Sequence, residues 1–195
     1  MTSLLRPALS LFVLLSVLTG LAYPLAVTGV SQLLFAHTAN GSILAVNGKP
    51  VGSALIGQNF TDPRHFWGRP SATGPQPYNG AASSGSNQGP LNPALIDAVK
   101  ARMAALRAAD PGNDQPVPID LVTASGSGLD PDISLAAARY QAVRVAKARS
   151  LPAETVQALI ELHAERPWLG IFGEPRVNVL RLNLALDGHE VQPLD

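Results

Sequence analysis

Apolar residues form one long block near the N-terminus and follow helical or alternating periods after it. Between positions 8 and 36, 20 of 29 residues are apolar, and the rest are Ser, Thr, Gly, Pro and one Gln. A helix needs about 20 such residues to cross the roughly 30 Å hydrocarbon layer of a bilayer. The pattern therefore predicts a transmembrane helix over residues 8–36, between a short N-terminal segment, 1–7, and a soluble domain, 37–195.

A cleaved secretory signal peptide is the alternative interpretation of this block. The apolar part of a signal peptide usually spans about 7–15 residues and precedes a cleavage site of small residues. The block is longer than that, and Tyr23-Pro24 interrupts any Ala-x-Ala site, which favours a retained anchor. Arg6 precedes the block and Lys49 is the first charge after it. The positive-inside rule then favours a cytoplasmic N-terminus and an extracytoplasmic domain.

The block contains no Asp, Glu, Lys or Arg. Ion pathways and proton relays normally place such groups inside the membrane, and one helix cannot enclose a pore, so the chain is not expected to transport ions alone. Small or compact residues recur every four positions, at Ser16, Gly20, Pro24 and Thr28. Such residues let membrane helices approach closely, which predicts a packing face for partner helices. The alternative is an anchor that merely tolerates them.

Residues 43–57 predict a β-hairpin. Ile43–Val46 and Val51–Ile56 flank Asn47-Gly48, a pair that favours the positive φ angles of a tight turn. Pro50 indicates that the second arm lies at a sheet edge or begins just after the turn. Residues 68–93 are rich in Gly, Pro, Ser and Asn, which is typical of a mobile loop.

Helical signals dominate the remainder of the chain. Asn92-Pro93 is an N-cap and first-turn pair, which predicts a helix ending near Ala109. Ser134 is expected to cap a helix over Leu135–Arg149, and Pro152 to open another that ends near Glu165.

Three further segments carry weaker signals. An extended piece is predicted over 117–123 and a polar loop over 124–134. Residues 177–186 fit both a strand and a helix, and Pro175 and Gly188 at their flanks favour the helix. The whole pattern predicts an α+β fold: a single N-terminal transmembrane helix followed by a small mixed α/β extracytoplasmic domain.

Composition excludes several classes of function. The 14 basic and 14 acidic residues balance, whereas a nucleic-acid binder normally shows a basic excess or patch. Because the chain has no Cys, thiolate chemistry, disulfides and Cys-ligated zinc are excluded. The four His residues lack the spacing of known metal motifs, so no metal site is predicted.

Aromatic and basic side chains have plain structural interpretations. Phe66-Trp67, and Trp168 with Phe172, are interpreted as core anchors, with membrane-interface residues as the alternative. The basic residues of the helix predicted over 135–149 are interpreted as a solvated surface: Arg139, Arg144 and Arg149.

Two Gly- and Ser-rich segments are candidates for chemistry. Backbone amides before the helix at Pro93 could receive a phosphate. The residues concerned are Ser84, Gly85, Ser86, Asn87, Gln88 and Gly89. The segment lacks the Lys of a P-loop, and the alternative is a turn-rich connector.

The second segment holds Ser125 and Ser127, with Asp130 close by. With a histidine from elsewhere in the chain they could form a hydrolase triad. No Gly-x-Ser-x-Gly elbow supports that interpretation, so no catalytic residue is assigned. The alternative is that the hydroxyls satisfy backbone groups in a tight loop.

Taken together, the motifs resemble the C subunit of the bacterial Kdp potassium-transporting ATPase. The resemblance runs nearly end to end, through TGLAYPLAVTG (19–29), ANGS (39–42), LIGQNF (55–60), FWGRPSA (66–72), SGSNQGPLNP (84–93), LVTASGSGLDPDIS (121–134), YQAVRVAKARSL (140–151) and EPRVNVLRLNLALD (174–187). Asp132 stands where that family usually has His, and Leu135 where it usually has Pro. These departures argue against an essential role for those two positions and do not affect the resemblance to the family.

The resemblance implies an ATP-driven, high-affinity potassium uptake complex in the bacterial inner membrane. Its partners would be a channel-like potassium-binding subunit, a P-type ATPase subunit and a small accessory peptide, all among membrane lipid. This subunit would be non-catalytic, would stabilise assembly, and would act as a catalytic chaperone that raises the affinity of the ATPase subunit for ATP. No cofactor is expected on this chain alone, and ATP would be met through the catalytic subunit at Ser84–Gly89.

An extracytoplasmic domain cannot touch cytoplasmic ATP. Both expectations hold together only if the coupling is indirect, through membrane helices that bias a conformational equilibrium. Two alternatives stay open at this point: a membrane-anchored extracytoplasmic hydrolase and an anchored solute-binding module.

Overall fold

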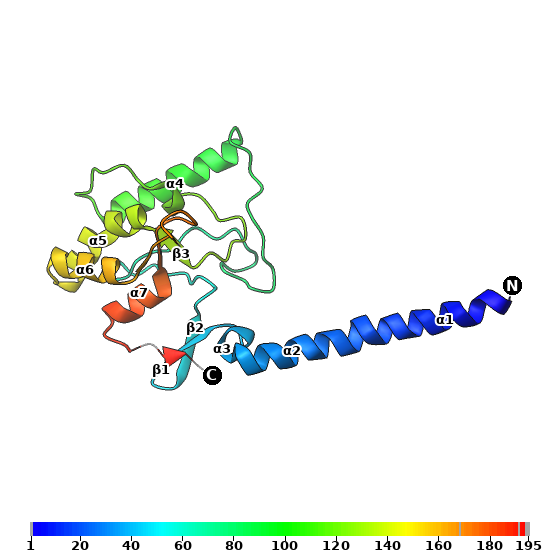
Figure 1. Ribbon diagram of the computed structural model, residues 1–195. Coiled ribbons are helices and arrows are strands. Elements are labelled where there is room, and N and C mark those ends of the chain that lie inside the picture. Colours follow the sequence, from blue (N-terminus) through cyan, green and yellow to red (C-terminus); the bar gives the residue numbers. More distant parts are fainter. Residues whose placement is uncertain (1, 168, 191, 194–195) are drawn as a thin grey trace.

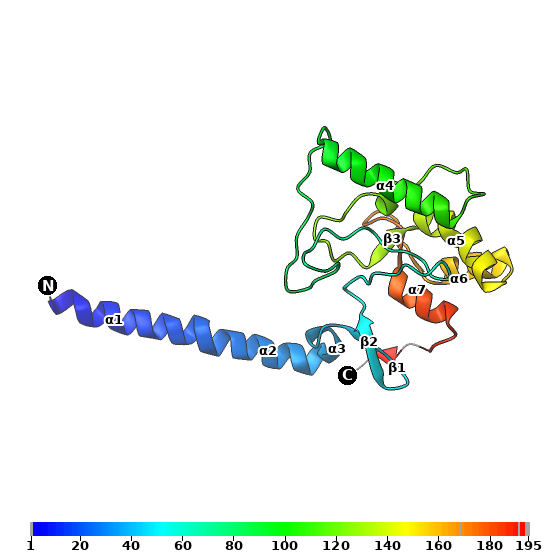
Figure 2. The same cartoon turned by 180° about the vertical axis from the view of Figure 1, so that it is seen from behind.

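A long apolar rod leads into a head that contains all the strands (Figure 1). The computed structural model describes residues 2–167, 169–190 and 192–193. The rod consists of helix α1 (Thr2–Val17), a π-helical turn (Leu18–Ala22) and helix α2 (Tyr23–Leu34), joined end to end. Its segment Leu4–Leu34 is long and apolar enough to cross a membrane, and none of it is buried against the head. Seen from behind, the rod again points away from the head (Figure 2).

The rod ends where the backbone leaves helical geometry. Phe35 has φ −141° and ψ 44°, and the short helix α3 (Ala36–Ala39) follows it. The amide of Gln32 in α2 donates a hydrogen bond to Oδ1 of Asn40 just after α3, over 3.0 Å. This hydrogen bond links the end of the rod to the turn that follows α3.

A small sheet lies at this joint. Strands β1 (Ile43–Val46), β2 (Lys49–Ser53) and β6 (Gln192–Pro193) form an antiparallel sheet in the order β2-β1-β6. Asn47 and Gly48 have φ angles of 52° and 73°, as a tight hairpin turn requires. The predicted hairpin is confirmed, although its second arm covers 49–53 rather than 51–56. Pro50 lies on the edge strand, where its missing N–H breaks no ladder.

A second sheet has the order β3-β5-β4 and is antiparallel throughout. Its strands are β3 (Asp132–Ser134), β5 (Arg176–Asn178) and β4 (Ala164–Glu165). The loop predicted over 124–134 was therefore wrong at its end, where β3 forms. The ambiguous segment 177–186 divides: residues 177 and 178 belong to β5, and helix α7 (Val179–Leu186) follows, capped by Asn178.

Two of the predicted helices have the expected bounds because their signals are local. Helix α4 (Pro93–Ala109) starts after Asn92, whose side chain accepts a hydrogen bond from the N–H of Ala94. Helix α5 (Leu135–Arg149) starts after Ser134, whose hydroxyl accepts one from the N–H of Ala137.

Two other expectations need correction. Helix α6 (Ala153–Leu162) ends three residues before Glu165, because residues 164 and 165 pair with β5 instead. The extended piece expected over 117–123 is wrong, since Ile119–Leu121 form a 3₁₀ turn.

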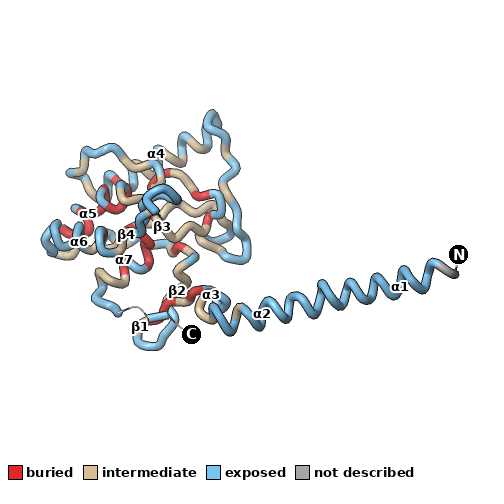
Figure 3. The backbone as a smooth tube through the Cα atoms, in the orientation of Figure 1, coloured by how far each residue is buried: buried red, intermediate tan, exposed pale blue. Residues whose placement is uncertain are grey.

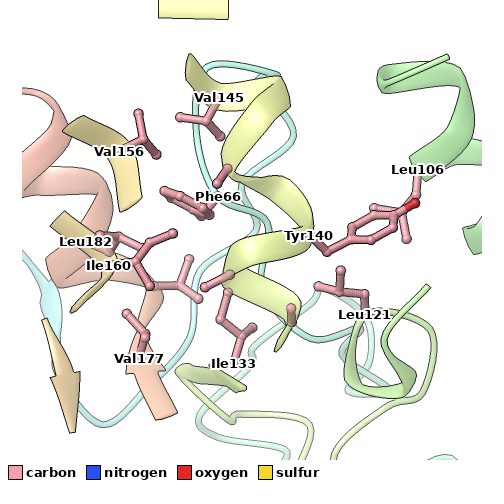
Figure 4. Close-up of a cluster of buried hydrophobic side chains, with 14 of the residues drawn as sticks. Phe66, Leu106, Leu121, Ile133, Tyr140, Val145, Val156, Ile160, Val177 and Leu182 are labelled. Atoms are coloured by element: carbon pink, nitrogen blue, oxygen red, sulfur yellow. The ribbon is translucent and has the colours of Figure 1, made fainter. Parts of the chain in front are cut away.

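The core of the head surrounds α5. Figure 3 shows buried residues concentrated along this helix, while residues 4–30 of the rod are exposed. Phe66, which no strand or helix contains, is fully buried, with 0% of its surface exposed. It lies among side chains of α5, α6, β5 and α7 (Figure 4). The core prediction is confirmed for Phe66, and Trp67 packs at the edge of the cluster. Trp168 lies outside the described residues, and Phe172 is 62% exposed, so the core interpretation is wrong for Phe172.

Polar side chains inside the core hold the segment that carries Phe66. Asn183 of α7 accepts a hydrogen bond from the N–H of Phe66 (2.8 Å) and donates one to its carbonyl (3.0 Å). Gln141 of α5 does the same for Trp67, at 2.8 and 3.1 Å. Each side-chain amide thus makes the two hydrogen bonds that a neighbouring strand would otherwise make with this segment. The backbone groups of Phe66 and Trp67 therefore keep hydrogen-bond partners when they are buried.

Arg144 completes this arrangement and contradicts the expected solvated surface. It is only 4% exposed, and its guanidinium donates to the carbonyls of Pro63 and His65 and to the side chain of Gln141. It also lies over the Trp67 ring, 4.6 Å from the centroid. Burial lowers the pKa of Arg144 to about 10, so it stays charged at neutral pH.

Arg149 is also drawn inward rather than solvated. Its guanidinium bonds the carbonyls of Arg64 and Leu186 and pairs with Asp187. Burial alone would raise the pKa of Asp187, but hydrogen bonds from Arg149 and His65 outweigh it and lower that pKa. Only Arg139 is exposed as expected.

We expect Arg144→Lys to destabilise the head by about 2 kcal/mol or more, because an ammonium cannot reach three acceptors as a planar fork does. Arg139→Lys on the same helix is the matched control and should change stability by less than about 0.5 kcal/mol, since its ion pair with Glu161 is exposed. Denaturant unfolding of the full chain, followed by tryptophan emission, measures both. Equal midpoints for the two variants would contradict a structural role for Arg144.

Candidate functional site

The two Gly- and Ser-rich segments of the sequence lie against each other. We call residues 83–85 and 125–128 the loop pair. The N–H of Ser84 donates to the carbonyl of Ser127 over 2.9 Å, and the Ser83 hydroxyl donates to the same carbonyl over 3.1 Å. A Cβ on Gly85 would lie 2.9 Å from the carbonyl oxygen of Gly126, so the approach depends on the missing side chain.

Gly128 is the tightest position in the loop pair. Its φ is +68°, a region that favours glycine, and a Cβ there would lie 2.6 Å from the carbonyl oxygen of Ser84. Its own carbonyl accepts a hydrogen bond of 2.7 Å from the Ser71 hydroxyl. The stretch 68–93, expected as a mobile loop, is thus hydrogen-bonded to the loop pair at several points.

Side chains of residues 69–79 organise this stretch. The Ser71 hydroxyl accepts from the N–H of Tyr78 (2.9 Å), and the Thr73 hydroxyl accepts from the N–H of Asn79 (3.0 Å). The Tyr78 hydroxyl donates to the carbonyl of Arg69. Burial, and then the negative charge of Asp130, raise the pKa of Tyr78 to about 12, so this hydroxyl remains a donor at neutral pH.

The six residues proposed to contact a nucleotide fall into two groups. Ser84 and Gly85 belong to the loop pair, whereas Ser86, Asn87 and Gly89 are exposed and Gln88 is partly exposed. At the start of α4, the Asn92 side chain already accepts the N–H of Ala94, and its carbonyl accepts those of Leu95 and Ile96. These donors are engaged by the chain itself, and nucleotide contact at residues 84–89 stays a prediction.

The residues of the hypothetical hydrolase triad are engaged elsewhere. Ser125 Oγ accepts from the N–H of Gly128 (2.9 Å), and Ser127 Oγ from the N–H of Leu129 (3.1 Å). Asp130 pairs with Arg69 over 3.0 Å. Within residues 2–167, 169–190 and 192–193, no histidine hydrogen-bonds to either hydroxyl. The hydroxyls thus satisfy backbone groups, as the structural alternative expects.

The same described part of the chain holds no group of three or more His, Asp or Glu residues that could bind a metal ion. The two positions that depart from the family resemblance have structural roles. Asp132 in β3 pairs with Arg176 over 3.0 Å, and burial raises its pKa. Leu135 is the first residue of α5, where a proline loses no hydrogen bond, so either residue fits.

The small residues of the rod lie around its π-helical turn. The N–H of Tyr23 bonds to the carbonyl of Leu18, five residues back, just before Pro24. Proline lacks an N–H and its ring crowds the carbonyl four residues earlier, so a wider turn here relieves the rod.

This turn also straightens the row of small residues. In an α-helix of 3.6 residues per turn, residues four apart drift by about 40° at each step. A π turn rotates less per residue and offsets part of that drift. Ser16, Gly20, Pro24 and Thr28 therefore lie closer to one line than in a regular helix, and we call them the rod ridge. A Cβ at Gly20 would meet nothing within 4 Å.

Comparison with known proteins identifies the family of this chain. The sequence model of the K+-transporting ATPase c chain, KdpC, matches residues 5–188. The chain belongs to the KdpC family.

Curated members of this family are similar over nearly their whole length. The potassium-transporting ATPase KdpC subunit of Polaromonas naphthalenivorans is 69% identical over 187 residues, which is 96% of this chain and 95% of that protein. Those of Variovorax paradoxus and Herminiimonas arsenicoxydans are 68% and 63% identical, covering 96% and 97% of this chain and 97% and 100% of their own. Membership of the KdpC family supports an accessory role in potassium uptake.

Sequence reasoning missed the buried polar residues that position this region. Gln141, Arg144 and Asn183 occur among apolar residues of α5 and α7, at positions that face inward. A polar side chain at an inward helical position is the signal that could have found them.

We expect Gly128→Ala to destabilise the loop pair by about 1–3 kcal/mol, because the added Cβ meets the Ser84 carbonyl at a left-handed φ. Gly89→Ala is the matched control, since a Cβ there meets nothing within 4 Å. Limited proteolysis within 83–89 and thermal unfolding measure the effect. If both variants resist proteolysis equally, the loops do not depend on this contact.

Proposed function

We propose that this chain is a non-catalytic accessory subunit of an ATP-driven potassium uptake complex, anchored by its rod in the bacterial inner membrane. The match to the K+-transporting ATPase c chain over residues 5–188 is the observation that carries the proposal. The rod supports it physically, because residues 7–34 contain no ionisable carboxyl, ammonium or guanidinium group that could line an ion pathway. Transport then has to take place in partner subunits.

The rod ridge is the proposed contact with those partners. In a bilayer, burial of apolar surface does not favour protein over lipid, so helices associate through close packing of small residues. Within Leu4–Leu34 no residue is buried in the isolated chain, which leaves the ridge free for neighbouring helices. A channel-like potassium-binding subunit, a P-type ATPase subunit and a small accessory peptide are the partners proposed to surround it.

The head is proposed to lie outside the cytoplasm and to clamp the channel-like subunit. This placement rests on Arg6 near the N-terminal end of the rod and on the absence of any Asp, Glu, Lys or Arg between it and Lys49. A higher ATP affinity of the catalytic subunit would then be transmitted through packed membrane helices, not through direct contact of Ser84–Gly89 with ATP. A subunit that binds one conformational state better shifts the equilibrium toward it.

Substitution on the rod ridge tests assembly. We expect Gly20→Val to reduce co-purification of the larger subunits from mild detergent several-fold, because its two methyl groups hold neighbouring helices apart. Gly29→Val is the matched control: it lies off the ridge and, like Gly20, has open space around it in the chain alone. Equal recovery of partners with both variants would contradict the ridge, and no partner with the wild type would contradict the accessory function.

Cysteine labelling tests the orientation, because the chain has no cysteine of its own. Ser86→Cys lies on an exposed part of the head and is expected to react with an impermeant maleimide in spheroplasts. Leu4→Cys, exposed at the far end of the rod, is expected to react only after lysis. The reverse pattern would show that the head faces the cytoplasm.

A further inference from the structure

The head contains a cavity of about 460 Å³ that none of the motifs discussed above explains. One wall comes from α4, and the others come from residues 58–61, 67–71 and 77–78 and from Leu121. Residues 84–89 do not line it. Its volume lies within the roughly 300–1,000 Å³ of small-molecule sites in proteins.

The walls are apolar and aromatic. Phe60, Trp67 and Tyr78 contribute rings, and Ala105 and Leu106 of α4 contribute aliphatic surface. The indole N–H of Trp67 donates to the carbonyl of Asp62 over 3.0 Å, and the hydroxyl of Tyr78 donates to the carbonyl of Arg69, so hydrogen bonds hold two of the rings in place. Such walls favour a flat apolar body over a freely hydrated ion.

The charge of the lining is one-sided. Two guanidinium groups, Arg69 and Arg102, line the cavity, and no carboxylate does. Arg69 is already paired with Asp130 over 3.0 Å. Arg102 forms no ion pair with a carboxylate of the described residues; its one hydrogen bond to protein runs from Nη1 to the carbonyl of Val122, over 2.8 Å.

Arg102 is therefore a partly buried cation whose desolvation no anion offsets. Burial lowers the pKa of Arg102, as expected when no carboxylate is near. A guanidinium has five N–H donors, and most of those of Arg102 have no acceptor among the residues that the structure describes. A bound carboxylate or phosphate would accept two of them side by side and supply the missing negative charge.

We propose that this cavity binds a small organic anion: a carboxylate or phosphate held by Arg102, attached to a flat apolar body that packs among Phe60, Trp67 and Tyr78. The inference does not depend on the proposed function. An accessory subunit with such a site would respond to a ligand of its own compartment, and the complex would still assemble if the site stayed empty.

Phenyl phosphate is the probe, because it joins an aromatic ring to a phosphate. It is titrated into the full-length chain in a Trp168→Phe background, which leaves Trp67 as the only tryptophan of the two in the sequence. We expect a saturable change in Trp67 emission, matched by calorimetry. Inorganic phosphate and benzyl alcohol, each carrying half of the chemistry, should bind at least roughly tenfold more weakly.

Two arginines on α4 distinguish binding at the cavity from a general effect of positive charge. Arg102→Gln should weaken phenyl phosphate binding roughly tenfold or more, as loss of a charge-assisted hydrogen bond predicts, while the exposed Arg107→Gln leaves it unchanged. If Arg102→Gln impairs folding, Ala105→Phe replaces it: this variant fills the cavity from an exposed helical position and should abolish binding. The proposal is overturned if the wild type shows no saturable response. It is also overturned if Arg102→Gln binds phenyl phosphate as tightly as Arg107→Gln, or if Ala105→Phe binds it as tightly as the wild type.

Discussion

Two side-chain amides, those of Gln141 and Asn183, determine where the central segment of the head lies. Each one bonds both the N–H and the carbonyl of a neighbouring residue, Trp67 and Phe66, in a segment that belongs to no sheet. Without them, burying Phe66 would leave four backbone groups without partners, at a cost of about 1–3 kcal/mol each. Arg144 adds the carbonyls of Pro63 and His65 to the same set of bonds.

The rest of the site follows from this anchoring. Once Phe66 and Trp67 are fixed, Arg69 is placed two residues on, where it reaches Asp130 and offers its carbonyl to Tyr78. Ser71, further along the same segment, donates to Gly128 of the loop pair, and residues 67–71 line the cavity. A further amide, that of Asn178, bonds the carbonyl of Ala54 after the hairpin and also caps α7, which carries Asn183. A continuous set of bonds thus runs from the sheet beside the rod to the centre of the head.

The elements that could be predicted from the sequence are those determined by residues close together in the sequence. The caps Asn92 and Ser134 and the turn Asn47-Gly48 act within a few positions, so α4, α5 and the hairpin could be located. Strands β3, β4 and β5 have only two or three residues each, and their pairing joins distant segments, so no periodic signal marks them. The candidate site was predictable only as two glycine-rich segments. Their contact, and the cavity that Arg69 and Arg102 both line, depend on packing between distant parts of the chain.

Strand β6 lies along β1, so the C-terminal strand closes one side of the small sheet beside the rod. Its two residues shield the hydrogen-bonding groups of β1 on that side. A chain shortened by its last few residues would leave β1 with an open edge, and an open strand edge is a template for pairing with another molecule. A tag or truncation that removes this pairing is therefore expected to promote self-association through β1.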